Sequence, residues 1–187
     1  RGTDRRPRVN LTAGIHGDEP AGVLGLLAFL EGLPKAFHRR FSLTVFPCVN
    51  PWGYERNDRH NARGMDINRC FHRGTNCAEV KVMMEVWARR TFDVCITCHE
   101  DYDSPGAYVY ELWRERSWGS EVLKAFGRHV PIDLRPVIEG RRAEQGLIRR
   151  RVTHYPPRLH PEAIYLVKGP RPHTQHTLTF ETPSLLP

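Results

Sequence analysis

Long apolar segments are absent from this chain of 187 residues. No segment is long and apolar enough to form a membrane-spanning helix, so we expect no membrane partner. The first residues, Arg1-Gly-Thr-Asp-Arg-Arg, contain no apolar stretch of the signal-peptide kind. These absences predict a soluble globular protein, which we place in the cytoplasm.

Cysteine is also sparse. The five cysteines form an odd number without the spacing of a disulfide framework. A disulfide-stapled scaffold is therefore not expected, and reduced thiols agree with a cytoplasmic location.

Lysine is rare, whereas arginine is not. Of the 28 basic residues, only Lys35, Lys81, Lys124 and Lys168 are lysines, and the formal net charge is +7. The densest basic stretch, Arg141-Arg142 with Arg149-Arg150-Arg151, has no interleaved aromatic residues and no accompanying recognition module. We therefore expect no nucleic-acid partner and interpret the charge as attraction for anionic small substrates.

Apolar strands and amphipathic helices alternate along the chain without internal repeats. This alternation predicts an α/β fold with a central, mixed, mostly parallel β-sheet flanked by helices. At 40% hydrophobic residues, the length suits a single domain, 1–187. The expected strands are 8–15, 41–46, 92–98, 163–167 and 177–180; the expected helices are 21–30, largely buried, 78–90 and 121–129; and 50–53 is expected to form a turn.

The pair His16 and Glu19 is the most informative local feature. It lies where the first expected strand turns into a helix, with Gly17 permitting a tight turn and Pro20 suited to the first helical position. An imidazole and a carboxylate three residues apart can there converge on one metal ion. The spacing alone is a loose pattern, which a surface turn would also explain.

Two further residues at strand ends support the interpretation of His16 and Glu19 as part of a metal site. His99 follows the strand 92–98 and Glu181 follows the last strand, so three strand ends supply three metal ligands and a base. Cys98 is next to His99, but successive residues of a strand face opposite sides of the sheet, so it cannot readily share the site.

The order of these motifs resembles the zinc carboxypeptidase superfamily, including its succinylglutamate desuccinylase and aspartoacylase branch. The similarity runs from His-x-x-Glu through Asn-Pro-x-Gly and Arg-x-Asn-x-x-Gly-x-Asp-x-Asn-Arg to His99-Glu-Asp and Thr-Phe-Glu181-Thr-Pro. Each motif is weak alone, but the ordered set is specific and covers most of the chain. The resemblance implies a zinc-carboxypeptidase-like (phosphorylase/hydrolase-like) fold.

The resemblance also implies roles for individual residues. His16, Glu19 and His99 would bind one Zn²⁺ ion, and Glu181 would be the general base. Arg59 would polarise the scissile carbonyl, and Asn68 with Arg69 would hold the free carboxylate of the substrate, a task for which a guanidinium fork is well suited. Asp66 is expected to orient the loop between them.

These roles predict a zinc-dependent hydrolase that cleaves an amide bond next to a free carboxylate. The spacing from Arg59 to Asn68 resembles bacterial peptidases, so a carboxypeptidase acting on short or cell-wall-type peptides is favoured. An N-acyl-amino-acid deacylase is the alternative, and a catalytically silent zinc-containing binding module is an alternative of another class. The oligomeric state and the side-chain specificity stay open.

Some features depart from the family pattern. Carboxypeptidases commonly carry a tyrosine on a mobile loop before the base, and Tyr155 and Tyr165 both match. His173 and His176 are expected in a loop near the mouth of the site rather than at a second metal. Because the chain begins almost on its first strand and ends six residues after Glu181, we expect a domain trimmed at both ends.

Overall fold

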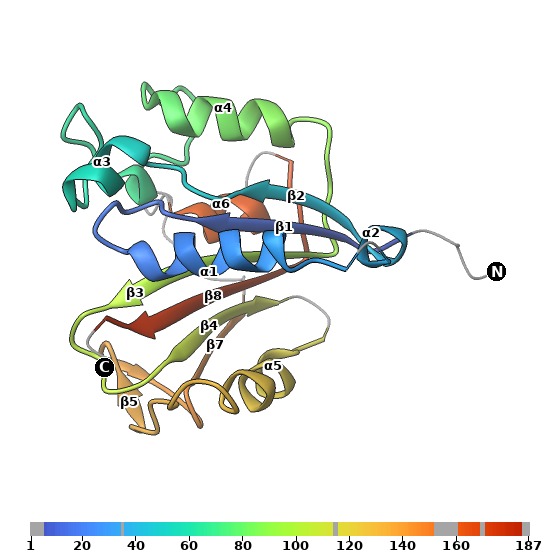
Figure 1. Cartoon of the computed structure of the whole chain (residues 1–187), viewed down its shortest axis with the longest axis vertical. Coiled ribbons are helices and arrows are strands. Elements are labelled where there is room, and N and C mark those ends of the chain that lie inside the picture. Colours follow the sequence, from blue (N-terminus) through green and yellow to red (C-terminus); the bar gives the residue numbers. More distant parts are fainter. Residues whose placement is uncertain (1–5, 35, 114–115, 152–160, 169–170, 185–187) are drawn as a thin grey trace.

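The computed structural model describes residues 6–34, 36–113, 116–151, 161–168 and 171–184, and it is built around a six-stranded sheet (Figure 1). The strand order is β2-β1-β3-β8-β4-β7, and every neighbouring pair is parallel except β4 with β8. A separate hairpin joins β5 to β6. The bounds are β1 Arg8–Ala13, β2 Ser42–Phe46, β3 Val94–Asp101, β4 Tyr108–Trp113, β5 Val137–Ile138, β6 Arg141–Arg142, β7 Leu147–Arg151 and β8 His176–Pro183.

Helices cover both faces of this sheet, which confirms the expected α/β layers (Figure 1). On one face α1 packs on β3, where Gly22 approaches Cys98, and α5 packs Leu123 against Val109. On the other face lie α4 and α6. The bounds are α1 Pro20–Glu31, α2 Phe37–Arg40, α3 Pro51–Arg56, α4 Ala78–Trp87, α5 Gly119–Phe126 and α6 Glu162–Lys168, with a 3-10 turn, η1, at Ile67–Arg69.

The largest core cluster fills the face of the sheet under α4. Trp87 is fully buried, stacks on Phe71, and donates its indole N–H to Asn10 at 2.9 Å. Cys95 belongs to the same cluster, whereas Cys98 packs on the α1 side. Cys98 therefore faces away from His99, as expected from strand alternation. All five cysteines are free thiols.

Two expected elements have a different conformation. The segment 163–167, expected to be a strand, lies in helix α6, because a short apolar run fits a buried helix as well as a strand. The expected turn at 50–53 is the start of α3: Asn50 caps the helix by accepting from the Gly53 N–H at 3.0 Å, and Pro51 occupies the first turn.

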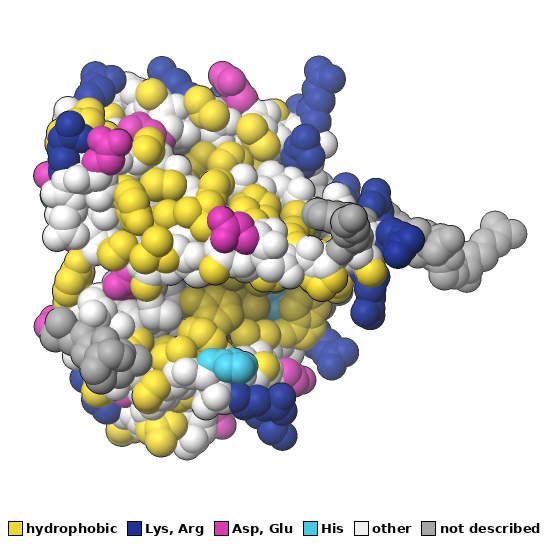
Figure 2. All heavy atoms as spheres, viewed as in Figure 1, with side chains coloured by type: hydrophobic (Ala, Val, Ile, Leu, Met, Phe, Trp, Pro, Cys, Tyr) yellow, Lys and Arg dark blue, Asp and Glu magenta, His cyan; other side chains and the backbone are white. Residues whose placement is uncertain are grey.

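Four strands, β4 to β7, were not expected from the sequence, and one helix is less buried than expected. Strands β4 and β7 complete the sheet, and arginines 149–151 belong to β7. In α1 only Val23 and Leu26 are buried, whereas Leu24 is 57% exposed. Figure 2 shows hydrophobic side chains gathered over this helix. Among the described residues, no helix is long and apolar enough to cross a membrane.

Candidate metal centre and pocket

The loop from β1 to α1 carries His16 and Glu19 and fits tightly against α3. A Cβ atom at Gly17 would lie 2.1 Å from the backbone carbon of Gly53, so no larger residue fits there without a shift. Glu19 takes the N-cap position of α1 but makes no capping bond with its side chain. Instead the Ala21 N–H donates to Glu100 at 2.5 Å, so the carboxylate of Glu19 is available for the site.

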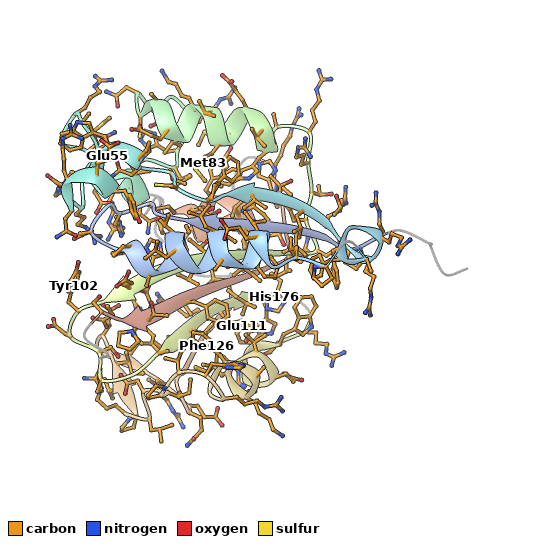
Figure 3. All side chains as sticks on the ribbon, in the orientation of Figure 1. Glu55, Met83, Tyr102, Glu111, Phe126 and His176 are labelled. Atoms are coloured by element: carbon orange, nitrogen blue, oxygen red, sulfur yellow. The ribbon has the colours of Figure 1, made fainter. Side chains whose placement is uncertain are left out.

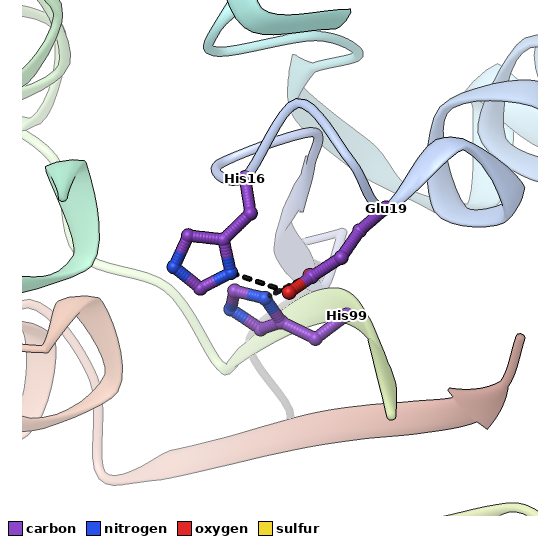
Figure 4. Close-up of side chains that lie close together, drawn as sticks. All are labelled: His16, Glu19 and His99. Atoms are coloured by element: carbon purple, nitrogen blue, oxygen red, sulfur yellow. Dashed lines mark hydrogen bonds and ion pairs between the residues drawn. The ribbon is translucent and has the colours of Figure 1, made fainter. Parts of the chain in front are cut away.

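The structure brings His16, Glu19 and His99 together in one buried cluster (Figure 4). His16 Nδ1 lies 2.5 Å from one carboxylate oxygen of Glu19, and His99 Nδ1 lies 2.6 Å from the other. Each of the three residues is less than 5% exposed. Among the described residues, this is the only group of three or more His, Cys, Asp or Glu side chains whose ligand atoms lie within 4.8 Å of one another.

The outer nitrogens of both imidazoles have partners of their own. His16 Nε2 lies 3.2 Å from Asp66 Oδ1, and His99 Nε2 lies 3.4 Å from Asn68 Nδ2. These contacts orient the rings so that each Nδ1 faces Glu19. Asp66 also accepts from the Asn68 N–H at 2.9 Å, so it orders its own loop as expected and supports the cluster as well.

Protonation in the cluster follows from its charges. Burial opposes ionisation of Glu19, but the positive charge of His99 and the hydrogen bonds to both histidines lower its pKa to about 2. Burial likewise opposes protonation of His16, yet its bonds to Asp66 and Glu19 raise its pKa above 6.5. A carboxylate that stays ionised between two inward-facing imidazole nitrogens is the donor set of a divalent cation.

The donor set fits zinc in its chemistry. Two imidazoles and one carboxylate are the three protein ligands of several catalytic zinc sites, and an outer carboxylate that orients a ligand histidine is typical of them. Here Asp66 is that outer carboxylate. The residues predicted as ligands from the sequence therefore form a site that could hold one metal ion.

Glu181 lies beside this cluster, on the neighbouring strand. It pairs in register with His99 across β3 and β8, and with Tyr108 across β8 and β4. Burial is the largest cause that raises its pKa well above 4.5, and the nearby charges of Glu19, Glu139 and Asp101 add to it. A carboxyl group poised to hold a proton suits general acid–base work.

The three remaining predicted residues line the pocket that contains this cluster. Arg59 contacts Glu19 at 3.5 Å and Asp66 at 3.2 Å. Asn68 accepts the Glu162 N–H at 3.0 Å, and Arg69 donates to the Asn68 carbonyl at 3.2 Å. The structure therefore places all seven predicted residues around one pocket.

That pocket has a volume of about 510 Å³. It extends across the sheet from the cluster of His16, Glu19 and His99 to β7. Its lining also contains residues that the sequence analysis did not assign to the site: Tyr108, Tyr110, Glu139, Arg141, Arg150 and Glu162. The alternation of Tyr108, Tyr110 and Leu112 along β4 would have placed these three on one face of a strand. Glu162 gave no signal, because its segment was expected to be a strand.

The family tyrosine is not found at Tyr165. Tyr165 lies on α6 and stacks on Trp87 with ring centroids 6.1 Å apart, so it is a core residue. Tyr155 lies outside the described residues.

The prediction that His173 and His176 lie in a loop near the mouth of the site is also wrong. His176 begins β8, at the end opposite to Glu181, and binds Glu111 at 2.7 Å. Figure 3 shows this pair on the opposite side of the molecule from Tyr102, which lines the pocket. His173 packs against Trp87 and Tyr165, so it belongs to the core cluster.

Comparisons with known proteins agree with this geometry. Residues 5–90 match the sequence model of the succinylglutamate desuccinylase/aspartoacylase catalytic domain. Murein peptide amidase A of Escherichia coli K12 is 41% identical over 61 residues, which are 33% of this chain and 24% of the amidase. This chain therefore corresponds to only part of that curated relative.

Solved structures extend the likeness to the whole fold. A candidate metallopeptidase from Shewanella baltica OS155 is 28% identical, with a TM-score of 0.82 over 100% of this chain and 72% of that one. The murein-tripeptide amidase of Escherichia coli O157 shares the fold at 18% identity, with a TM-score of 0.64 over 97% of this chain and 75% of the amidase. In its fold and in the order of its motifs, the chain is similar to the zinc-carboxypeptidase-like superfamily.

Proposed function

We propose that this chain is the catalytic part of a zinc-dependent hydrolase that cleaves an amide bond next to a free carboxylate. The observation that carries this proposal is the convergence of His16, Glu19 and His99 in a buried cluster with Glu181 on the adjacent strand. In this proposal the three clustered residues hold one zinc ion. When bound, zinc supplies Lewis-acid polarisation and lowers the pKa of a water molecule.

Glu181 moves the proton in this proposal. Its carboxylate takes a proton from the attacking water and later returns that proton to the nitrogen of the leaving amine. Burial and the neighbouring carboxylates favour the protonated form of Glu181 in the free protein. The negative charges that raise its pKa therefore make it a stronger base toward the water.

In this proposal two arginines and an asparagine bind the negatively charged groups of the substrate. Arg59 lies between the metal cluster and Asp66, where its guanidinium can stabilise negative charge that develops on the carbonyl oxygen. Asn68 and Arg69 lie at the rim of the same pocket and would bind the free carboxylate through charge-assisted hydrogen bonds.

The favoured substrates are short or cell-wall-type peptides, cleaved by carboxypeptidase action. The likeness to murein peptide amidase A over 61 residues supports this choice. An N-acyl-amino-acid deacylase is the second candidate, because residues 5–90 match the succinylglutamate desuccinylase/aspartoacylase catalytic domain.

A substrate panel tests both candidates. Purified protein loaded with zinc should release a carboxyl-terminal amino acid from short peptides faster than it hydrolyses N-succinyl and N-acetyl amino acids. The reverse order would favour the deacylase. Zinc binding without hydrolysis of either class would make the chain a silent binding module and overturn the proposal.

A further inference from the structure

Glu139 lines the pocket, but the proposed chemistry gives it no contact with the substrate. It forms the turn between β5 and β6 together with Gly140, and both residues have positive φ angles, 47° and 68°. This geometry is that of a type I′ turn, in which asparagine, aspartate and glycine are preferred. A glutamate in this conformation is strained, because its Cβ atom approaches the following carbonyl oxygen. Such strain is typical of residues in binding sites.

A small core cluster fixes the base of this hairpin. Ile138 is 1% exposed and Ala143 is 8% exposed, and both belong to a cluster with Tyr108 and Ile148 of the large sheet. The tip of the hairpin, where Glu139 lies, is therefore held in a fixed place relative to β4 and β7.

Glu139 lies close to the proposed base. One of its carboxylate oxygens accepts from the Tyr110 hydroxyl on β4 at 2.5 Å. Asp101, at the end of β3, accepts from the hydroxyl of Tyr108 at 2.9 Å. The negative charges of both carboxylates are among the causes that raise the pKa of Glu181. Two carboxylates, each bonded to a tyrosine of β4, therefore border the pocket beside the base.

The order of the site residues shows which part of a substrate reaches this place. Asn68 lies 3.4 Å from His99 Nε2, and Glu181 pairs with His99 on the next strand. Tyr108 pairs with Glu181 on the strand after that, and Figure 1 shows β5 at the end of the molecule to which β3 and β8 point. A substrate whose carboxylate lies at Asn68 therefore extends its acyl part past the base toward the hairpin.

The two carboxylates suit an ammonium group. A carboxylate offers about four acceptor sites. Hydrogen bonds from described residues occupy one site of Glu139 and two of Asp101. An ammonium has three donors, and its bonds to carboxylates are charge-assisted. Arg141, at the other end of the turn, also lines the pocket and would favour an anionic acyl group, which is the opposite case.

We propose that Glu139, together with Asp101, is a specificity-determining residue that binds the free amino group of the acyl part of the substrate. The preferred substrate is therefore a short peptide with an unblocked amino terminus, such as a dipeptide. This inference rests on the proposed function, because that function places the scissile bond between the carboxylate site and Glu181. It favours peptidase action over N-acyl-amino-acid deacylation, because the substrates of a deacylase lack that amino group.

Binding is measured by calorimetry on zinc-loaded protein with three matched ligands. All end in alanine, and their acyl groups are alanyl, propionyl and succinyl. The scissile N–H is replaced by a methylene group, so the ligands bind without being cleaved. The alanyl ligand should bind about three- to tenfold tighter than the propionyl ligand, because the contact is charge-assisted but lies at an exposed turn.

Glu139→Gln keeps an acceptor for Tyr110 and removes the charge. The alanyl-to-propionyl affinity ratio should fall to about one in this variant, with propionyl affinity within about twofold of wild type. Glu144→Gln is the matched control, because Glu144 is also exposed but bonds Arg149 at 2.8 Å outside this pocket. The ratio should stay at its wild-type value in Glu144→Gln.

Equal binding of the alanyl and propionyl ligands by the wild type would overturn the inference. Tightest binding of the succinyl ligand would also overturn it and would assign the recognition to Arg141. An unchanged ratio in Glu139→Gln, with or without a uniform loss of affinity, would make the hairpin structural. The cleavable parent compounds test the proposed function separately. Alanyl preference that depends on Glu139, without hydrolysis of alanyl-alanine or propionyl-alanine, would support the inference and contradict the proposed function.

Discussion

The carboxylate of Asp66 lies 3.2 Å from Nε2 of His16, on the side of the ring opposite to Glu19. This contact keeps a proton on Nε2 when Nδ1 binds a metal, and it fixes the plane of the ring. Asp66 comes from the same loop as Asn68, and it accepts the Asn68 N–H at 2.9 Å. One carboxylate therefore links the predicted metal site to the predicted carboxylate-binding residue.

Asp66→Asn should weaken zinc affinity about 10- to 100-fold, because the amide keeps the hydrogen-bonding shape but loses the charge that orients His16. A competition titration with a chelating dye measures the change. Asp133→Asn is the control: Asp133 is buried but binds Ser104 and Arg135 outside the pocket. Unchanged zinc affinity in Asp66→Asn would show that His16 needs no outer partner.

Zinc should raise the thermal stability of the protein. A ligand at about 100 times its dissociation constant stabilises the folded state by about 2.7 kcal/mol, provided that it does not bind the unfolded chain. Glu19→Gln should abolish the shift in melting temperature, because Glu19 is the residue that contacts both histidines. Glu85→Gln, on the exposed face of α4, should keep the full shift. Elemental analysis should give one zinc ion per chain.

Much of the fold and of the predicted site could be inferred from the sequence, because both rest on local signals. His16, Glu19 and Pro20 mark the junction of β1 and α1, and the structure has that junction where it was expected. His99 and Glu181 follow apolar runs that form neighbouring parallel strands, and their side chains come together because those strands pair in register.

The other residues that line the pocket could not be inferred, because their positions depend on contacts between distant segments. Strand β7 contains Leu147 and Ile148 followed by three arginines, and that basic run hides the strand pattern. The position of Glu162 depends on whether residues 163–167 form a helix or a strand, and a run of five apolar residues does not distinguish them. Its contact with Thr12 spans 150 residues.

Glu181→Gln should retain zinc and lose turnover, because an amide cannot accept the proton of the attacking water. The loss should be about 100- to 10,000-fold in kcat, the range for a general base. Steady-state hydrolysis and metal content are measured on the same preparation. Activity near the wild-type level would exclude Glu181 as the base.

Neutralising Glu139 should move the pH dependence of the same reaction. The charge of Glu139 is among the causes that raise the pKa of Glu181, and its carboxylate accepts from Tyr110 at 2.5 Å. Glu139→Gln keeps an acceptor for Tyr110 and removes that charge, so the pKa of Glu181 should fall. The acid limb of kcat/KM, which reports the free base, should shift to lower pH. A shift to higher pH would contradict this coupling.

Arg69→Ala should harm substrates with a free carboxylate more than their carboxamide analogues. Arg69 lines the pocket and donates to the Asn68 carbonyl at 3.2 Å, and its removal would leave the carboxylate without its charged partner. A charge-assisted bond corresponds to about 1.5–3 kcal/mol, or roughly 10- to 150-fold in kcat/KM. Arg63→Ala, from the same loop but outside the pocket, is the control. Equal losses on both substrate types in Arg69→Ala would exclude the carboxylate contact.

Glu162 should make the folded protein less stable as pH rises from about 4.5 to about 7. Its pKa is about 7 in the folded state against 4.5 for an ordinary glutamate. Between these values the folded state keeps the proton that the unfolded state has released, so stability falls with increasing pH and levels off above the folded-state pKa. Glu162→Gln has no such titration. Relative to this variant, the wild type should lose about 2–3 kcal/mol of unfolding free energy between pH 5 and pH 8. Urea unfolding of both proteins at each pH measures the difference, in which the titrations of other groups cancel. A difference in unfolding free energy that stays constant with pH would mean that Glu162 keeps an ordinary pKa. In that case some positive charge compensates the carboxylate in the free protein.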